Sequence, residues 1–561
     1  MRLAPLLLLL VLGCQDNASQ VPTVNLQPAF QMFGSGDAEG ALAMLDSLEA
    51  ANPESAQVLA ARGQFLRQMQ ELEGSLAAYE GAVDLNPSAP GTLFNLGIAH
   101  ALVGQDDDAM DALLRARDAG FNVLNIHNSP VAGRLAERDD FAALFPAPGD
   151  YADPFVEGTE IIHDWTGENA RDQFGWIARN VRDVDGDGVD DAVSSAPTNS
   201  DGAPSGGKIY VYSGRSGDLL WTAVGQDAQG QLGFGVEAAG DVNGDGTPDV
   251  IAGAPYANVA MVYSGVDGSV IHRIEGSDPA GAFGATVRGI GDVNDDGFGD
   301  LLIGEPHQVW GGPIGGGTLD HPGAAHIVSG RDASTLATRV GANPGDGFGS
   351  TLAGTLDGGN SPYVVGAPSA GSENRGRAYV YRGLAPEAEH EFAPSATGVN
   401  LGAMFMSVMG DANGDGVQDF YISDWADAAK GPSTGRIYVF SGADGSTLAE
   451  IGGENAGDGF GIGVSDAGDI DGDGLADLII GAWQYAGEAA SGGKLYAYTG
   501  QGTLLHTVTG KVMGETLGFD TTGLGDVNGD GVVDFLVTSA WSGINGFQSG
   551  RTLVISGQNP N

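Results

Sequence analysis

Acidic side chains recur in this 561-residue chain at a spacing that can hold a metal ion. Six nonapeptides follow the pattern Asp-x-(Asp/Asn)-x-Asp-Gly-x-x-Asp, and each precedes an apolar run. Positions 1, 3, 5 and 9 carry oxygen side chains, and Gly at position 6 permits a sharp turn that directs the carbonyl of position 7 toward the same point. This arrangement predicts Ca²⁺ binding. The expected ligands are Asp183, Asp185, Asp187, Val189 and Asp191; Asp241, Asn243, Asp245, Thr247 and Asp249; Asp292, Asn294, Asp296, Phe298 and Asp300; Asp411, Asn413, Asp415, Val417 and Asp419; Asp469, Asp471, Asp473, Leu475 and Asp477; and Asp526, Asn528, Asp530, Val532 and Asp534.

Electrostatics favours a filled loop over an empty one. Each loop brings three or four carboxylates together, and each pair of charges repels by roughly 1 to 4 kcal/mol at effective dielectric constants of 80 to 20. A divalent cation converts this repulsion into attraction. We therefore expect six Ca²⁺ ions as the cofactor.

The EF-hand begins with the same acidic pattern but requires a bidentate Glu at position 12 and a following helix. Position 12 is Ser194 in the first loop, Ala252 in the second and Ile480 in the loop that begins at Asp469. The runs that follow have the length of buried strands and end at Gly or Pro. Each loop is therefore expected at the tip of a β-hairpin.

The composition restricts the partners. The chain has 94 Gly and a formal net charge of -49, which excludes nucleic-acid binding through a basic face and argues against an anionic membrane surface. We interpret the acidic residues outside the loops as solvated surface.

The N-terminus resembles a bacterial lipoprotein signal. Residues 1–13 contain a positive start and a short apolar stretch, and Cys14 is the single Cys of the chain. The resemblance implies cleavage before Cys14, lipidation of its thiol and a tether over 14–21, although Leu12 departs from the small residue that the motif favours. Gln15 favours the outer membrane or cell surface. An ordinary secreted protein is the alternative.

With a single Cys, the exported part has no disulfide of its own to stabilise it. External calcium is the expected substitute. No later segment is apolar enough to span a bilayer, so the membrane is expected to be reached through the lipid alone.

Residues 22–146 show helical repetition. Pro53 and Pro87 are 34 residues apart, as are Gly63 and Gly97. Small residues at a fixed step let paired helices approach closely, and Pro ends the second helix of a pair. The pattern resembles tetratricopeptide repeats, with three repeats at 22–55, 56–89 and 90–123 and a cap at 124–146. Such a solenoid offers a groove for a protein partner, or serves as a spacer, and a linker is expected over 147–158.

Seven units of 49 to 65 residues follow. Each contains an apolar strand, a turn, a second strand that ends in Gly-Ala-Pro or a variant, a third strand, a Gly turn and a fourth strand. Four-stranded sheets of this kind bury their faces only against neighbours, which predicts an all-β seven-bladed propeller after the all-α domain. The units open at Phe174-Gly175, Phe234-Gly235, Phe283-Gly284, Phe348-Gly349, Leu401-Gly402, Phe460-Gly461 and Leu517-Gly518.

These openings and acidic loops resemble the FG-GAP repeats of integrin alpha subunits over residues 159–557. The resemblance implies a calcium-binding propeller that serves recognition or adhesion. Two departures matter. The seventh unit lacks a fourth strand, and we expect residues 159–167 to complete it and close the ring. The fourth unit has Gly354–Pro362 in place of an acidic loop, so we expect it to bind no calcium.

The end of the propeller opposite the acidic loops is expected to bind ligands, because its second-to-third loops are longer and more varied. Units five to seven place Trp425, Trp483 and Trp541 after the second strand, and Trp310 lies nearby in unit three. Such side chains can stack on sugars or anchor a partner protein. The alternative, which we favour, is that they fill gaps between blades.

Enzymatic motifs are weak. Gly431–Gly435 matches Gly-x-Ser-x-Gly, but it precedes a strand in a Gly-rich loop. His321 and His326 are not in a His-Glu-x-x-His frame, and the nine His are scattered along the chain. We therefore expect no catalytic residue and a lipid-anchored extracytoplasmic calcium-binding protein for recognition or adhesion. An extracellular glycan-binding or polysaccharide-processing protein is the alternative, and an inert envelope scaffold is the third.

Overall fold

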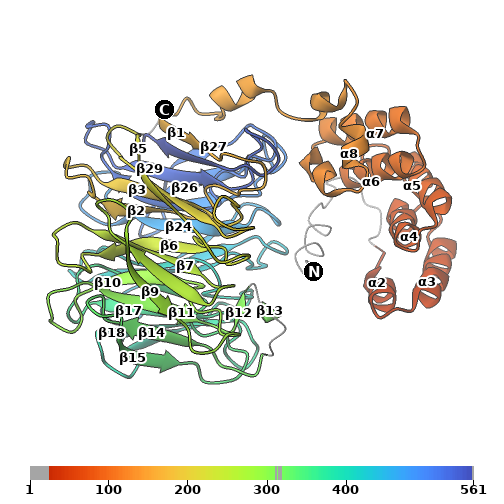
Figure 1. Ribbon diagram of the computed structural model, residues 1–561. Coiled ribbons are helices and arrows are strands. Elements are labelled where there is room, and N and C mark those ends of the chain that lie inside the picture. Colours follow the sequence, from red (N-terminus) through yellow and green to blue (C-terminus); the bar gives the residue numbers. More distant parts are fainter. Residues whose placement is uncertain (1–23, 310–311, 314–318, 559–561) are drawn as a thin grey trace. The chain divides into compact units, whose positions relative to one another are not determined.

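The computed structural model describes residues 24–309, 312–313 and 319–558. It divides into two compact units, with the boundary between Ala152 and Asp153. The first unit is helical and the second consists of β-sheets (Figure 1). The predicted signal peptide, Cys14 and Trp310 lie outside the described residues.

The helical unit consists of three helical hairpins and a shorter C-terminal part. Among the residues described, no helix is both long and apolar enough to cross a bilayer. The elements are α2 (Gln27–Gly34), α3 (Ala38–Ala51), α4 (Ala56–Gln68), α5 (Leu72–Leu85), α6 (Pro90–Leu102), α7 (Asp106–Asp118), η1 (Val123–Asn128), α8 (Ala132–Leu135), η2 (Phe141–Leu144) and η3 (Pro148–Ala152).

Glycine sets the close approach of the paired helices. A Cβ on Gly63 in α4 would lie 2.9 Å from the ring of Tyr79 in α5. One 34-residue step later, a Cβ on Gly97 in α6 would lie 2.7 Å from Leu113 in α7. The repeated small residues therefore act as predicted, because larger side chains would separate the helices.

The second unit contains seven four-stranded antiparallel sheets, the blades of a propeller, as the sequence predicts. The first strands are β2 (Ala178–Arg182), β6 (Gly235–Gly240), β10 (Val287–Gly291), β16 (Thr351–Gly354), β20 (Met406–Met409), β24 (Phe460–Gly468) and β28 (Thr521–Gly525). The second strands are β3 (Asp191–Ala196), β7 (Asp249–Ala254), β11 (Asp300–Glu305), β17 (Pro362–Ala367), β21 (Asp419–Asp424), β25 (Asp477–Ala482) and β29 (Asp534–Ser539).

The outer half of each blade is formed by the next two strands. The third strands are β4 (Lys208–Tyr212), β8 (Val259–Tyr263), β14 (Ala324–Val328), β18 (Arg377–Arg382), β22 (Arg436–Phe440), β26 (Lys494–Thr499) and β30 (Arg551–Ile555). The fourth strands are β5 (Leu219–Val224), β9 (Val270–Glu275), β15 (Thr335–Val340), β19 (His390–Phe392), β23 (Thr447–Gly452), β27 (Leu504–Thr509) and β1 (Ile161–Thr166). Blade 3 also carries a small hairpin of β12 (Gln308–Val309) and β13 (Gly312–Pro313).

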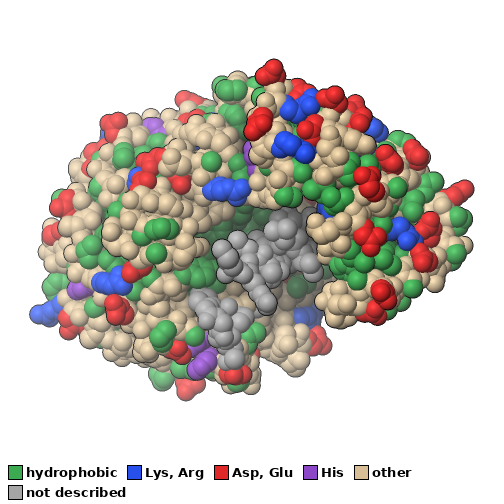
Figure 2. Space-filling model, turned by 45° about the vertical axis from the view of Figure 1, so that its right-hand side comes forward, with side chains coloured by type: hydrophobic (Ala, Val, Ile, Leu, Met, Phe, Trp, Pro, Cys, Tyr) green, Lys and Arg blue, Asp and Glu red, His purple; other side chains and the backbone are tan. Residues whose placement is uncertain are grey.

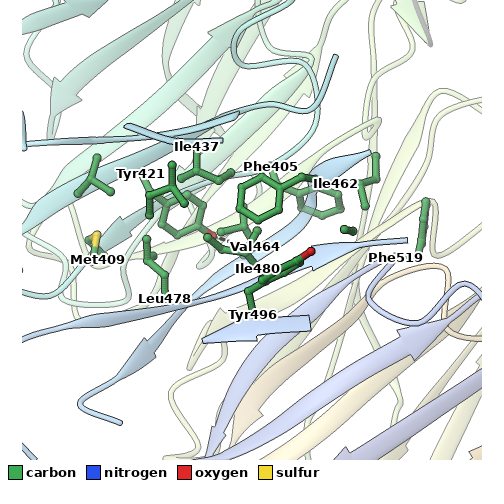
Figure 3. Close-up of a cluster of buried hydrophobic side chains, with 14 of the residues drawn as sticks. Phe405, Met409, Tyr421, Ile437, Ile462, Val464, Leu478, Ile480, Tyr496 and Phe519 are labelled. Carbon is green, nitrogen blue, oxygen red and sulfur yellow. Dashed lines mark hydrogen bonds between the residues drawn. The ribbon is translucent and has the colours of Figure 1, made fainter. Parts of the chain in front are cut away.

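The hydrophobic core lies between neighbouring blades. The first strands contact one another around the ring, and every residue of the second strands is buried. Figure 3 shows one such cluster, in which Phe405, Tyr421 and Ile437 of blade 5 meet Val464 and Ile480 of blade 6. Burial of both sheet faces explains why the second strands read as continuous apolar runs.

The ring closes through β1, which precedes the first blade in sequence but pairs antiparallel with β30 of the last. Arg551 on β30 forms two hydrogen bonds with the carboxylate of Asp164 on β1, at 2.7 and 2.8 Å. Trp165 stacks on Tyr212 of blade 1 with ring centroids 4.3 Å apart, and its indole N–H donates to the Gly217 carbonyl. Strand β1 therefore belongs to the sheet of blade 7 and also contacts blade 1.

Acidic side chains are spread over the molecular face in Figure 2, with fewer Lys and Arg side chains among them. This distribution agrees with the net charge of -49. It supports the interpretation that much of the acid outside the loops is solvated surface.

Candidate metal sites

All six acidic loops are turns between the first and second strands, so they lie at one end of the propeller. Position 1 organises each loop. In the first, Oδ1 of Asp183 accepts the backbone N–H of Asp187 at 3.1 Å, and Oδ2 accepts that of Gly188 at 2.8 Å. The same two bonds, from positions 5 and 6 to position 1, occur in the other five loops.

Glycine at position 6 has the conformation that the sequence predicts. Its φ lies between +83° and +88° in all six loops, a region that L side chains rarely adopt. The glycines are Gly188, Gly246, Gly297, Gly416, Gly474 and Gly531.

Position 9 is the first residue of each second strand and is at most 1% exposed. One oxygen of each of these carboxylates accepts the backbone N–H of position 2, at 2.8 to 3.0 Å. In blade 6 the other oxygen, Oδ1 of Asp477, is buried and has no hydrogen-bond partner in the described part of the chain. An ion can satisfy this oxygen.

Burial makes the position 9 carboxylates difficult to ionise. It raises the pKa of Asp191, Asp249, Asp300, Asp477 and Asp534 to about 6, and that of Asp419 in the same direction. Neighbouring carboxylates of the same loop add to the increase. A bound cation would act in the opposite sense by stabilising the charged form.

The carboxylates of positions 1, 3 and 9 converge in two of the six loops. In the first loop, oxygens of Asp183, Asp185 and Asp191 lie within 4.8 Å of one another, and those of Asp469, Asp471 and Asp477 do the same in blade 6. The position 5 carboxylates belong to neither group among the described residues, and that of Asp187 pairs with Arg215 at 3.0 Å instead. The other four loops have Asn at position 3, and its amide oxygen accepts the N–H of position 5 at 2.8 to 2.9 Å, as Asp does elsewhere. An oxygen-only, carboxylate-rich set fits a hard cation such as Ca²⁺.

Blade 4 differs at this end. Its turn contains a single carboxylate, Asp357, which accepts a hydrogen bond from Gln418 at 3.1 Å. The backbone N–H of Gly359 donates to the carbonyl of Asp292 at 2.6 Å. This turn therefore packs on the acidic loop of blade 3 instead of forming a cage of its own.

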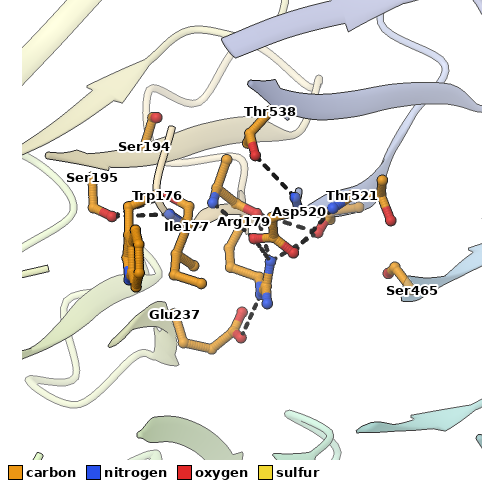
Figure 4. Close-up of polar contacts among 12 residues, drawn as sticks. Trp176, Ile177, Arg179, Ser194, Ser195, Glu237, Ser465, Asp520, Thr521 and Thr538 are labelled. Carbon is orange, nitrogen blue, oxygen red and sulfur yellow. Dashed lines mark hydrogen bonds and ion pairs between the residues drawn. The ribbon is translucent and has the colours of Figure 1, made fainter. Parts of the chain in front are cut away.

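Ion pairs that the sequence analysis missed lie near the propeller axis. The first strands line a cavity of about 500 Å³. Arg179 of blade 1, which lines this cavity, pairs with Asp520 of blade 7 and with Glu237 of blade 2, as Figure 4 shows. Arg288 of blade 3 also pairs with Glu237. Buried charges require such pairing, so these contacts tie four blades together.

The predicted aromatic residues meet at the opposite end of the ring. Trp483 and Trp541 have ring centroids 4.9 Å apart, and Phe519 lies 4.6 Å from Trp541 and 5.7 Å from Trp483. Trp176, which the sequence analysis did not single out, lies 5.8 Å from Trp541. Trp425 packs against the same core and is partly buried. We call these five residues the aromatic cluster.

Packing does not satisfy every polar group of the aromatic cluster. The indole N–H of Trp176 donates to the Phe234 carbonyl at 3.1 Å. The indole nitrogen of Trp483 is buried without a hydrogen-bond partner among the described residues. Both interpretations of the Trp residues, packing and ligand contact, therefore stay open.

Histidines that share no local motif in the sequence come together in blade 3. His307 and His321 stack beside Asp278, with ring centroids 4.2 Å apart. In the same blade, Nε2 of His326 lies 2.8 Å from a carboxylate oxygen of Glu305. The signal in the sequence is that His307 and His321 flank the second-to-third loop of unit three. No local motif connects them to Asp278, which precedes blade 3.

Comparison with known proteins bears on the second unit. Residues 236–272 match the FG-GAP repeat family, and residues 469–537 match the FG-GAP-like repeat family. Integrin alpha-5 of Xenopus laevis is 27% identical over 174 residues, which are 27% of this chain and 16% of that protein.

Two further relatives give similar values. Integrin alpha pat-2 of Caenorhabditis elegans is 30% identical over 227 residues, covering 34% of this chain and 17% of that protein. Integrin alpha-11 of Homo sapiens is 30% identical over 199 residues, covering 30% of this chain and 17% of that protein. The chain thus matches about a sixth of the length of these curated relatives.

Proposed function

We propose that this chain, which contains FG-GAP repeats and is similar to integrin alpha subunits in its seven-bladed propeller, is a calcium-binding protein of recognition or adhesion. The observation that carries the proposal is the difference between the two propeller ends. One end holds six acidic turns with the same hydrogen-bond pattern. The other holds the long loops and the aromatic cluster.

Calcium serves the proposed function by making the propeller rigid. Six ions, one in each acidic loop, neutralise carboxylates that otherwise repel one another at the start of the second strands. Blade 4 holds none, because its turn lacks the cage. Rigid blades keep the loops of the opposite end in one arrangement, which lowers the ordering cost of binding.

The aromatic cluster is the proposed contact for a protein partner. Trp is enriched among residues that dominate binding energies, because it buries a large area at low entropic cost. Trp425, Trp483 and Trp541 are only partly buried, so part of each ring is open to a ligand. Tyr256, at the same end, is 44% exposed and extends this surface.

The membrane anchor and the location are further parts of the proposal. The motif that ends at Cys14 supports a lipoprotein on the outer membrane or cell surface, where calcium is abundant. The three helical hairpins resemble tetratricopeptide repeats, whose groove would bind a second partner or separate the propeller from the membrane. Residues 147–158 would serve as the linker between them.

A double substitution tests the role of the aromatic cluster. In a screen of surface proteins and glycans with and without chelator, the full chain should bind a protein ligand in a calcium-dependent manner, and Trp483→Ala/Trp541→Ala should weaken that binding at least tenfold. Leu219→Ala/Leu504→Ala is the matched control, since both Leu are about half exposed on outer strands. Binding that survives the Trp substitutions in a folded protein would refute the assignment.

A glycan ligand is the second candidate. It is favoured by the same observation, since Trp and Tyr rings beside exposed polar loops can stack on sugars. Binding on the glycan arm of the screen, without a protein ligand, would select it. Turnover of a bound polysaccharide would overturn the expectation that the protein is not an enzyme.

A further inference from the structure

Blade 3 contains a second kind of ligand cluster at the end of the propeller opposite the acidic loops. Asp278 lies in the link from β9 to β10, His307 follows β11, and His321 lies shortly before β14. The β12–β13 hairpin, labelled in Figure 1, begins directly after His307. One oxygen or nitrogen atom of each side chain lies within 4.8 Å of the other two.

We propose that Asp278, His307 and His321 form a binding site for a divalent transition-metal ion of the Zn²⁺ class, separate from the six calcium loops. Two imidazole nitrogens and one carboxylate oxygen are a donor set that Zn²⁺ accepts, whereas Ca²⁺ prefers oxygen ligands throughout. Three protein ligands leave a fourth position for water or a ligand from outside.

The carboxylate is oriented for this role. Oδ1 of Asp278 accepts the backbone N–H of Ala280 at 2.9 Å. Oδ2 faces both histidines, at 3.9 Å from Nδ1 of His307 and 4.0 Å from Nε2 of His321. Ligands of tetrahedral zinc lie about 3.4 Å apart, so each imidazole must move about 0.5 Å toward Oδ2. The rings must also tilt out of their parallel stack, because the lone pair of a ligating nitrogen lies in the plane of its ring.

His307 has two features of a preformed ligand. Its Nδ1 is buried and lacks a hydrogen-bond partner among the residues described, which is unusual for a polar atom in a folded protein. Its backbone has φ +57°, and its N–H donates to the Gly281 carbonyl at 2.8 Å. Strained conformations held by such contacts are concentrated at ligand sites.

The charges around the cluster also suit a metal. Burial lowers the pKa of the His307 imidazole, and the adjacent His321 adds to the decrease, although Glu305 and Asp278 act in the opposite sense. The neutral imidazole, which is the form that ligates metals, is therefore favoured at neutral pH. Nε2 of His326 lies 2.8 Å from Oε2 of Glu305, so a second pair of a histidine and a carboxylate lies beside the cluster.

Zinc titration of the full chain in millimolar Ca²⁺ tests the proposal, because calcium then occupies the acidic loops. Calorimetry of the wild type should show one Zn²⁺ ion per chain. His307→Ala/His321→Ala should weaken this binding at least about 100-fold, and Asp278→Asn should weaken it by a smaller factor. The matched control is His272→Ala/His390→Ala, which removes two imidazoles from the outer strands of blades 2 and 4 and should bind zinc like the wild type.

Anomalous scattering at the zinc edge, measured on wild-type crystals, makes the test independent of how the variants fold. The expected result is a zinc atom bonded to Asp278, His307 and His321. A zinc atom elsewhere, no uptake by calcium-loaded protein, or unchanged affinity in a folded His307→Ala/His321→Ala variant would overturn the proposal. The calcium-dependent function is unaffected by any of these results.

Discussion

Calcium linkage to stability is the sharpest test of the acidic loops, because it counts ions. Each site that is saturated in the folded chain and absent from the unfolded chain adds about 1.4 kcal/mol to the free energy of unfolding per tenfold increase in free Ca²⁺. Six sites should therefore add about 8 kcal/mol per tenfold increase, and seven sites about 9.5 kcal/mol. The measurement is denaturant unfolding of the full chain in buffers of fixed free Ca²⁺.

Blade 6 offers a matched pair of variants. Asp469 accepts three backbone N–H groups at 2.7 to 3.1 Å, so Asp469→Ala removes both a ligand and the hydrogen bonds that shape its loop. This variant should lose about 1.4 kcal/mol from the slope per tenfold change, in addition to any calcium-independent loss. Asp471→Asn should keep the full slope, because four of the other loops already have Asn at position 3.

The slope, not the absolute stability, decides the outcome. Asp357→Asn in blade 4 should leave it unchanged, since that turn has no cage. A wild-type stability that is the same in chelator and in millimolar Ca²⁺ would refute the reasoning for all six loops. An equal slope for Asp469→Ala and the wild type would refute it for blade 6.

Three further predictions concern the ring, the helices and pH. Deletion of residues 159–167 should lower the melting temperature far more than removal of nine exposed residues would, because it takes away β1; an unchanged melting temperature would contradict the closure. In α6, Gly97→Ala should destabilise the chain by about 1 to 2 kcal/mol in denaturant unfolding, whereas Gly91→Ala, whose new Cβ lies 3.7 Å from its nearest neighbour, should be neutral or stabilising; equal effects would refute the packing argument. Burial raises the pKa of Asp424 to about 6, so its contribution to stability is largest below pH 4 and falls as the pH rises through 6. The free energy of unfolding of Asp424→Asn, relative to that of the wild type, should therefore rise by on the order of 2 kcal/mol between pH 4.5 and pH 7.5, measured in saturating Ca²⁺; a difference that does not change with pH would contradict the pKa shift.

Repetition is what made the fold predictable. The acidic loop is a local structure, so its nine residues determine where one strand ends and the next begins, and Asp249 starts β7 as the spacing predicts. Likewise, Gly63 and Gly97 have the same role one repeat apart, because each faces the second helix of its own hairpin. The closing strand could also be predicted from the sequence, since residues 159–166 resemble other fourth strands and the last unit lacks one.

Contacts near the axis could not be predicted in the same way. Asp520 and Arg179 are separated by 341 residues, and their meeting depends on the number of blades and on the register of each first strand. The Trp residues show the same limit. Trp483, Trp541 and Trp176 come from the consecutive blades 6, 7 and 1 and pack against one core cluster, which agrees with packing between blades, but their meeting depends on how the ring brings their strand ends together.

The histidine cluster combines both limits. His307 and His321 have no counterpart in any other unit, so they break the repeat. Asp278 does have one, because Asp227 occupies the same place in a Gly-x-Asp-x-x-Gly link, so comparison of the repeats does not single it out. They meet because one belongs to the link into blade 3 and two flank its second-to-third loop, which are adjacent at the same end of a propeller. In a repeat protein the shared residues specify the scaffold, and the residues that break the repeat are free to specify a site. A search for chemistry in such a fold should therefore begin with side chains that occur in one blade and no other.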